Sequence, residues 1–282
     1  MDDDDLSLER AAFDTERAEF DLLRAAALLP RVEGRTPDVE AVVFQVERWA
    51  AEVKEDAARR TSRQGPLEAI MNVLFAGAQL RGDNEEYDAP RNSFLEDVIV
   101  RRRGLPISLS LLVTETARRA GFVACGLALP RHFMAGLMLE SHGAATDDAG
   151  GDLFFIDAFH ATVLTLDAVA QRASVSVPEL GEHLGPASPE AVLVRMLTNL
   201  RASYLRRQEP VPCLRVISRL LLLRPREAAL HLERAHLLFG LGDAPTALSA
   251  AETGLKLARD PDEREAAEKV FERMTANVGW IQ

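Results

Sequence analysis

Apolar residues recur at helical spacing through the first quarter of the chain. They lie three or four positions apart in residues 7–29, and Pro30 and Gly34 end that stretch. Similar apolar stripes follow in residues 39–53 and 67–75. The apolar face of such a helix is stable when it is buried, so the pattern predicts three helices that contribute to a core.

Residues 81–92 interrupt this pattern with a cluster of Gly, Asn, Asp and Pro, which is typical of a loop. A loop of this length inside a compact domain is often functional. Helical spacing returns after Pro106 and continues to Gly121, a residue suited to ending a helix. Because most positions of this later helix are apolar, we expect it to be buried.

The hydrophobic period changes after Gly121. Residues 122–129, 133–140 and 153–156 are short apolar runs of strand length, separated by turn residues. Residues 143–151 are rich in Ala, Asp and Gly and are expected to form a hairpin loop. The pattern therefore predicts a small antiparallel sheet packed on the preceding helices.

The chain beyond Pro186 returns to helical spacing. Breaks at Pro225 and Pro261 lie 36 residues apart, close to the tetratricopeptide period of about 34. Between them, a Leu-Gly-Asp turn at residues 241–243 separates two segments rich in Ala and Leu. This order resembles one tetratricopeptide hairpin, and residues 200–220 resemble a degenerate copy.

Length and composition permit one large or two modest domains, because 282 residues with 47% hydrophobic content can fill a sizeable core. No apolar run approaches the roughly 20 residues of a membrane helix, and the first five residues are acidic where a signal peptide is basic. The two cysteines, Cys125 and Cys213, are too few for a disulfide framework. We expect a soluble protein of the reducing cytoplasm, with no membrane partner.

The net charge of -11 argues against nucleic acid as a partner, because phosphate binding needs a dense cationic surface. Residues 91–131 nevertheless hold seven arginines and three acidic residues, a local balance of +4. Two interpretations remain open. These arginines line a cleft that favours an anionic ligand, or they solvate helix faces and pair with nearby acids.

No metal or cofactor is predicted. His231 and His236 lie five residues apart, about 140° around a helix, which does not suit a shared metal site. The chain has three lysines and lacks a glycine-rich phosphate-binding loop that ends in one of them. Nucleotide hydrolysis is therefore not expected.

Several segments carry a more specific signal. They are Pro-Arg-Asn-Ser-Phe-Leu at residues 90–95, Gly-Leu-Pro-Ile-Ser-Leu-Ser at 104–110, Leu-Pro-Arg-His-Phe at 129–133 and Phe-Ile-Asp-Ala-Phe at 155–159. In this combination, the chain from about residue 65 onward resembles the bacterial SirB-type proteins of the transglutaminase-like superfamily.

The resemblance implies an α+β fold of the papain-like cysteine-protease type, in which a small antiparallel sheet packs on helices. An all-α tetratricopeptide-like tail follows. The chain then divides into N-terminal helices packed on the core in residues 1–64, a transglutaminase-like domain in residues 65–185 and the helical tail in residues 186–282.

The same resemblance implies a catalytic cysteine at a helix N-terminus, with a histidine and an aspartate on two adjacent strands. Unpaired amides at the helix start favour a thiolate, the histidine accepts its proton, and the aspartate orients the imidazole. His132 matches the histidine and Asp157 the aspartate. The nucleophile position falls near Pro106, with Ile107 and Ser108 as neighbours, and no cysteine is present there.

Three interpretations of this site remain open. The site is a relic in which His132 and Asp157 form a hydrogen-bonded pair that orders a pocket. Alternatively, Ser108, His132 and Asp157 form the triad of an amide-bond hydrolase or acyl transferase. Against that alternative, the N-terminus of a helix stabilises a neutral serine less than a thiolate. Ser108 is also suited to capping the helix. In the third interpretation these residues are structural or serve another chemistry.

In the relic interpretation the protein is a binding or regulatory module. Its pocket holds a small or peptide ligand through Tyr87, Arg91, Asn92 and Arg131, in addition to the three site residues. The helical tail either recruits a protein partner or packs on the first domain. Cys125, in the middle of a strand with an apolar face, is expected to be buried and structural, and Cys213 likewise.

Overall fold

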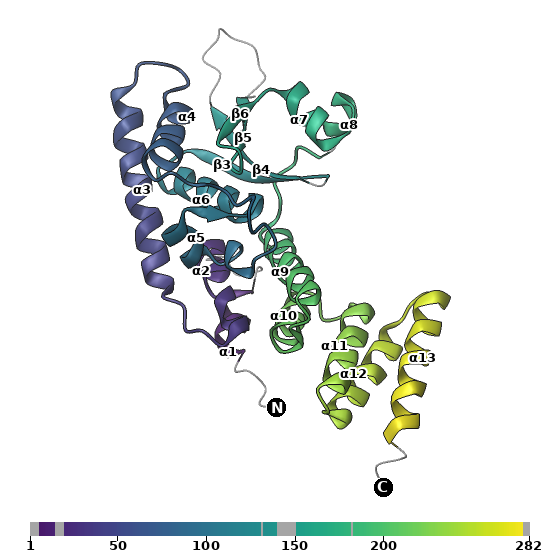
Figure 1. Cartoon of the computed structure of the whole chain (residues 1–282). Coiled ribbons are helices and arrows are strands. Elements are labelled where there is room, and N and C mark those ends of the chain that lie inside the picture. The colour runs from purple at the N-terminus through teal and green to yellow at the C-terminus, as the bar shows by residue number, and fades with distance from the viewer. Residues whose placement is uncertain (1–5, 15–19, 131, 140–150, 182, 279–282) are drawn as a thin grey trace. The chain divides into compact units, whose positions relative to one another are not determined.

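The computed structural model describes residues 6–14, 20–130, 132–139, 151–181 and 183–278 (Figure 1). It contains two compact units. The core unit comprises residues 21–30 and 36–196, and the tail unit joins N-terminal residues and residues 31–35 to residues 197–282. This grouping differs from the division expected at residues 64 and 185, because the first N-terminal helix belongs with the tail.

The helices that precede the sheet follow the predicted pattern in part. They are α1 (Ser7–Ala12), α2 (Leu22–Ala27), the 3-10 turn η1 (Leu29–Glu33), α3 (Val39–Arg59), α4 (Gly65–Ile70), the π-helical turn η2 (Met71–Gly77), the 3-10 turn η3 (Pro90–Asn92), α5 (Leu95–Arg101) and α6 (Pro106–Arg119). The single helix predicted over residues 7–29 is instead two helices. Asp21 starts the second one, because its side chain accepts the Arg24 N–H at 3.1 Å.

The predicted antiparallel sheet is confirmed, with one strand more than expected. Its order is β3 (Val123–Leu129), β4 (His132–Leu139), β5 (Asp152–Asp157) and β6 (Thr162–Leu164). The predicted loop over residues 81–92 contains β1 (Arg81–Gly82), which pairs in parallel with β2 (Arg103–Gly104). Most of the hairpin loop predicted over residues 143–151 lies outside the described residues.

The register of β4 decides which side chains share a face of the sheet. Leu129 lies opposite His132, and Ala135 lies opposite Ile156. Successive side chains on a strand point to opposite faces, and paired residues point to the same face. His132 and Asp157 therefore lie on one face, while Ala135 and Ile156 lie on the other.

Different helices cover the two faces (Figure 1). α7 (Leu166–Ala173) and α8 (Val177–Gly181) cover the face that carries His132 and Asp157. The buried cluster on this side consists of Leu127, Leu129, Met134, Phe155, Val169, Ala170 and Leu180. α6 packs on the opposite face, where Ala135 and Ile156 are buried.

The tail is helical, as predicted. α9 (Pro189–Arg206) leads into α10 (Pro210–Leu223), α11 (Ala228–Gly240), α12 (Ala244–Leu257) and α13 (Pro261–Val278). α11 and α12 form a hairpin whose turn uses Gly242 at a positive φ of 87°. Asp243 then starts α12 by accepting the Thr246 N–H at 3.3 Å. In the described part of the chain, no helix combines the length and apolar character needed to cross a bilayer.

A buried ion pair holds α1 to α10 within the tail unit. The Oε1 atom of Glu9 accepts hydrogen bonds from Arg31 Nε at 2.9 Å and from Arg219 Nη2 at 2.5 Å. Glu9 and Arg219 are both fully buried. Two buried charges that compensate each other are costly to separate, so this pair fixes α1 on the tail.

Replacing one partner of the pair tests its role. In Glu9→Leu the Arg219 guanidinium loses this carboxylate, and we expect the free energy of unfolding to fall by about 3–5 kcal/mol. Glu9→Leu/Arg219→Met removes both charges and is expected to recover part of that loss. Urea unfolding followed by circular dichroism measures both changes. Glu265→Leu, at an exposed pair with Lys269 in α13, is the control and should unfold like the wild type. Equal stability of Glu9→Leu and the wild type would contradict the role of the pair.

Candidate functional site

Asp157 is the centre of a charged cluster at the end of β5. Its Oδ1 atom accepts the main-chain N–H groups of Phe159 and His160, each at 3.1 Å. Its Oδ2 atom bonds to His160 Nδ1 at 2.9 Å and to the guanidinium of Arg172. The carboxylate is almost fully buried. Its hydrogen bonds therefore hold the turn after β5, and its charge is balanced by Arg172 on α7.

His132 lies on the same face of the sheet as Asp157. Burial is the largest cause that lowers the pKa of His132 below its ordinary value. A hydrogen bond to the Arg172 main chain opposes this effect, and the charges of Arg172, Arg195 and His160 lower the pKa further. His132 is therefore a neutral imidazole at pH 7. We call His132, Asp157, His160 and Arg172 the strand-end cluster.

Ser108, the predicted alternative nucleophile, lies in the first turn of α6 and is fully buried. Its Oγ atom donates to the carbonyl oxygen of Asn92 at 2.7 Å and accepts the N–H of Leu105 at 3.0 Å. Gly104 packs closely against it, since a Cβ at residue 104 would lie 2.8 Å from Oγ.

The structure does not assemble the Ser108, His132 and Asp157 triad. The hydrogen bonds of Ser108 go to the main chain, and those of Asp157 go to His160, Arg172 and the turn after β5 rather than to His132. α6 also covers the face of the sheet opposite to the one that carries His132 and Asp157. The physical reason is the two-residue alternation of the strands, which fixes the face of every side chain once the register is set.

The predicted ligand-binding residues have different roles in the structure. Asn92 is buried and holds the preceding loop by donating to the Glu86 carbonyl oxygen at 2.7 Å. Its Oδ1 atom accepts from Arg101 at 2.8 Å. Arg91 forms an exposed ion pair with Glu86. Arg131 lies outside the described residues.

Tyr87 remains available to a ligand, because it is half exposed. Its ring meets that of Phe159 edge to face, with centroids 5.9 Å apart. The Phe159 carbonyl oxygen in turn accepts the Gly82 N–H of β1 at 2.8 Å. Tyr87 is thus connected to the turn that carries Asp157 and His160.

Arg195 on α9 belongs to the same unit, although no motif in the sequence marks it as a functional residue. Its guanidinium carbon lies 5.5 Å from the centroid of the Phe133 ring, which fits a cation–π contact. Burial lowers the pKa of Arg195, and the nearby Tyr87 opposes that effect. Periodicity marks residue 195 only as part of a helix, so its contact with the Phe133 ring depends on tertiary structure.

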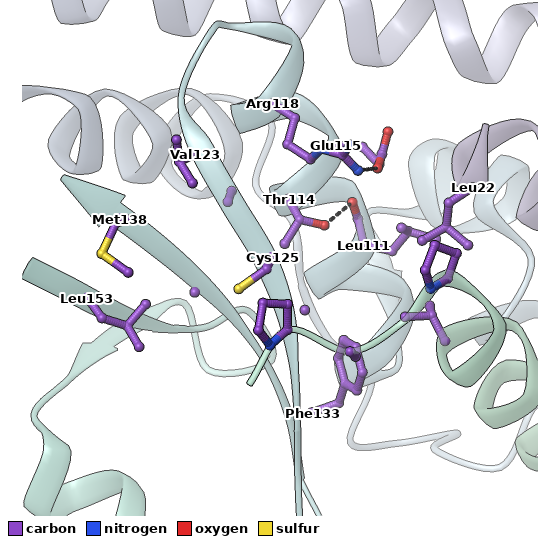
Figure 2. A pocket seen from close by; sticks show the side chains of 17 residues that line it. Leu22, Leu111, Thr114, Glu115, Arg118, Val123, Cys125, Phe133, Met138 and Leu153 are labelled. Carbon is purple, nitrogen blue, oxygen red and sulfur yellow. Dashed lines mark hydrogen bonds and ion pairs between the residues drawn. The ribbon is translucent and has the colours of Figure 1, made fainter. Parts of the chain in front are cut away.

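An apolar pocket opens along the edge strand β3 (Figure 2). Its volume is about 430 Å³. The walls come from α6, from β3 and β4, and from the segment that runs into α9. The lining residues include Leu111, Cys125, Phe133, Met138, Pro186 and Val192. Pro186 pairs with Leu127 of β3 in an isolated antiparallel β-bridge. The Ala187 N–H donates to the Gly126 carbonyl oxygen at 2.8 Å.

Cys125 is not placed to act with His132. Cys125 shares the face of His132, but it lies four residues along β3 from the end that pairs with His132. At roughly 3.3 Å per residue this separates them by about 13 Å. Burial raises the pKa of the Cys125 thiol and raises that of Cys213 to about 11. Within the described ranges, no group of three or more His, Cys, Asp or Glu residues is placed to hold a metal ion.

Comparison with known families matches two regions of the chain. The profile of the transglutaminase-like superfamily matches residues 40–198, and that of a tetratricopeptide repeat matches residues 200–273. The first match covers more than half of the chain. Together they agree with the predicted α+β domain followed by a tetratricopeptide-like tail.

Similar proteins come from bacteria and from animals. A UPF0162 protein of Xylella fastidiosa strain 9a5c is 33% identical over 147 residues, which cover 49% of this chain and 48% of that protein. A UPF0162 protein of Pseudomonas aeruginosa is 28% identical over 215 residues, covering 76% and 72% of the two chains. Human F-box only protein 21 is 30% identical over 141 residues, 48% of this chain and 21% of its own. The chain thus spans about half the length of the first of these relatives. No solved structure matches the chain significantly.

The environment of Cys125 predicts low thiol reactivity. Because burial raises its pKa, the thiol is protonated at pH 7 and should react with iodoacetamide more slowly than free cysteine. Cys213→Ser leaves Cys125 as the one thiol of the chain, so mass spectrometry of this variant reports its rate directly. Unfolding in urea serves as the control and should accelerate labelling. Labelling of the folded variant faster than free cysteine would instead indicate an activated thiolate.

The charges around His132 predict how its pKa responds to substitution. Arg195→Met removes a positive charge that opposes the imidazolium, so the pKa of His132 should rise. A pH titration of the His132 ring protons by NMR measures the change. Arg48→Met, at an exposed arginine on α3 paired with Glu52, is the matched control and should leave the pKa unchanged. An unchanged pKa in Arg195→Met would place Arg195 too far from His132 to act on it.

Proposed function

The chain belongs to the transglutaminase-like superfamily, and we propose that it is a non-catalytic binding or regulatory module in which ligand recognition has replaced acyl chemistry. The core unit binds a small or peptide ligand at the former catalytic region and the adjoining pocket. The tail, which matches a tetratricopeptide repeat, recruits a protein partner. Repeats of this kind build surfaces for protein partners.

The observation that carries this proposal is the burial and hydrogen bonding of Ser108 in the first turn of α6. A nucleophile must be exposed to its substrate and hydrogen-bonded to a base. Ser108 is fully buried, and its hydroxyl bonds to the main chain of Asn92 and Leu105. In this position Ser108 supports the loop before α5 and the start of α6.

The ion pair between Asp157 and Arg172 supports the same conclusion. In a catalytic triad the carboxylate orients the imidazole and stabilises the imidazolium that forms. Here Arg172 neutralises Asp157, and burial and the charge of the Arg172 guanidinium lower the pKa of His132. Both effects disfavour a protonated His132, which is the species that a general base must become during acyl transfer.

The pocket beside β3 supports ligand binding. A volume of about 430 Å³ lies within the range of roughly 300–1,000 Å³ that is usual for small-molecule sites. Its walls are mainly apolar, and α6, β3 and β4 hold them in place. A ligand that buries an aliphatic or aromatic group there gains free energy in proportion to the apolar area removed from water.

Labelling with a fluorophosphonate probe tests the absence of acyl chemistry. We expect no labelling of the folded wild type, because the Ser108 hydroxyl is buried and engaged. We expect Ser108→Ala to lower the free energy of unfolding by about 0.5–1.5 kcal/mol, the usual net value of a hydrogen bond. The Leu105 N–H and the Asn92 carbonyl oxygen lose the hydroxyl but keep the hydrogen bond between them at 3.1 Å. Ser218→Ala, whose hydroxyl bonds only within α10, is the control and should change stability less. Labelling of the wild type that is lost in Ser108→Ala would support the hydrolase and refute the binding module.

A further inference from the structure

We propose that the open edge of β3 binds an extended peptide as an additional strand of the sheet, with side chains of the peptide in the apolar pocket beside that edge. This inference rests on the proposed binding function, because it names the ligand class of the core unit. Two observations carry it together. Main-chain groups of β3 point away from β4, and the walls of the pocket lie on both faces of the strand.

The hydrogen bond of Gly126 shows which main-chain groups of β3 point away from β4. Its carbonyl oxygen accepts the Ala187 N–H at 2.8 Å, so Gly126 presents its main chain to the outer edge. In an antiparallel ladder, every second residue of a strand exchanges hydrogen bonds with the partner strand, and the residues between point the other way. Ala124 therefore also faces outward, while Cys125 and Leu127 face β4.

The chain itself covers one end of this edge. Pro186 pairs with Leu127 in an antiparallel β-bridge, after which the chain turns into α9. Toward the other end, the Ala124 N–H, the Ala124 carbonyl oxygen and the Gly126 N–H have no hydrogen-bond partner among the described residues. Ala124 and Gly126 are both partly exposed. The edge thus pairs with an extended segment at one end and is open at the other.

The sequence of β3 does not protect its edge. Edge strands of soluble proteins are usually blocked by a charged residue, a proline, a bulge or a very short length. β3 has seven residues, pairs with β4 without a bulge, and contains neither a charged residue nor a proline. The opposite edge strand, β6, has three residues. Because the free N–H and carbonyl groups of an edge bind a further extended main chain, β3 is the edge at which this sheet can gain a strand.

The pocket receives side chains on the face of β3 that carries Cys125. Residues that lie side by side on adjacent strands point to the same face. Side chains of the added strand next to Val123 and Cys125 therefore lie on this face. Met138 and Leu153 share the face and line the pocket (Figure 2). Val123 is 71% exposed and Met138 38% exposed, so this end of the sheet has an uncovered apolar surface.

The pocket also extends to the opposite face, toward α6. Side chains of the added strand next to Ala124 and Gly126 point to that face. Phe133 of β4 and Leu111 of α6 line the pocket there. Since the walls on both faces are mainly apolar, the segment that fits has apolar residues at successive positions. A strand with one wet face would instead alternate apolar and polar residues.

The charge of the chain disfavours a second copy as the occupant. Two chains that paired through their β3 edges would each carry a net charge of -11 and would repel each other. The open part of β3 spans residues 123–126, so few hydrogen bonds would offset that repulsion. A short peptide with a net positive charge is attracted instead. We therefore assign the edge to an apolar segment that is flanked by basic residues.

A matched pair of peptides tests the main-chain requirement. Acetyl-Lys-Lys-Val-Leu-Val-Ile-Lys-Lys-amide supplies successive apolar residues between basic ends. Its control has the same side chains but N-methyl groups on the central apolar residues, which remove their N–H donors and prevent close approach to a strand edge. We expect the unmethylated peptide to bind the full chain at least about tenfold more tightly, because the control loses the hydrogen bonds to the edge. Isothermal titration calorimetry measures both Kd values.

Hydrogen exchange followed by NMR locates the bound peptide. In the free chain, the amides of Ala124 and Gly126 should be less protected than those of Cys125 and Leu127, which bond to β4. A saturating concentration of the unmethylated peptide should slow exchange at Ala124 and Gly126 by at least about tenfold. A peptide that only filled the pocket would leave these two amides unprotected.

Variants test the edge itself. In Ala124→Pro the proline ring replaces an outward-facing N–H, so the ladder with β4 is kept while the added strand is blocked, and peptide affinity should fall at least about tenfold. Val123→Lys places a charge at the open edge and keeps the test valid if Ala124→Pro does not fold. Phe44→Lys, at an exposed apolar residue of α3 outside the pocket, is the matched control and should bind like the wild type. Thermal unfolding of each variant verifies the fold.

Four results would overturn the proposal: no binding of the unmethylated peptide, equal binding of the two peptides, unchanged exchange at Ala124 and Gly126, or unchanged affinity in a folded edge variant. Protection of these amides that rises with protein concentration in the free chain would assign the edge to a second copy and overturn it as well. The fluorophosphonate probe measures acyl chemistry separately. Failure of the strand-binding edge and failure of the non-catalytic module are therefore distinguishable.

Discussion

The register of β4 against β3 and β5 is the constraint on which the rest of the site depends. Pairing Leu129 with His132 and Ala135 with Ile156 sends His132 and Asp157 to the face that α7 and α8 cover. A slip of one residue would turn both to the side of α6. The burial of Ile156 on the α6 side makes such a slip costly, because it would bring the charged Asp157 to that side in place of Ile156.

Once the register is fixed, the buried polar groups near the strand ends and at the start of α6 must find partners. Asp157 is too deeply buried to remain an unpaired carboxylate, and Arg172 on α7 supplies the compensating charge. Ser108 is equally buried, and its hydroxyl satisfies the main chain of Asn92 and Leu105. The side chains of Asp157 and Ser108 therefore stabilise the fold through these interactions. Arg195 differs, because among the described residues its guanidinium packs on the Phe133 ring and forms no ion pair.

Sequence periodicity predicted the antiparallel strands, the buried helix and the helical tail, because local spacing determines each of them. It could not predict α7 as the partner of Asp157. Arg172 lies 15 residues from Asp157, and nothing in the spacing links the two. The hydrogen bond from Ser108 to Asn92 spans 16 residues and depends on how η3 and α6 meet. The break between α1 and α2 was missed because the apolar stripe continues across Asp21, while the capping side chain decides the boundary.

The proposed function asks less of the site than acyl transfer does. Acyl transfer needs a thiolate or an activated hydroxyl, a base that can accept its proton and a carboxylate that stabilises the resulting imidazolium. Ligand recognition needs only a concave apolar surface and a few directed polar groups. Here the charges that would drive proton transfer cancel one another in the strand-end cluster. The pocket along β3 and the open edge of that strand do not depend on the cluster, so they retain the capacity to bind.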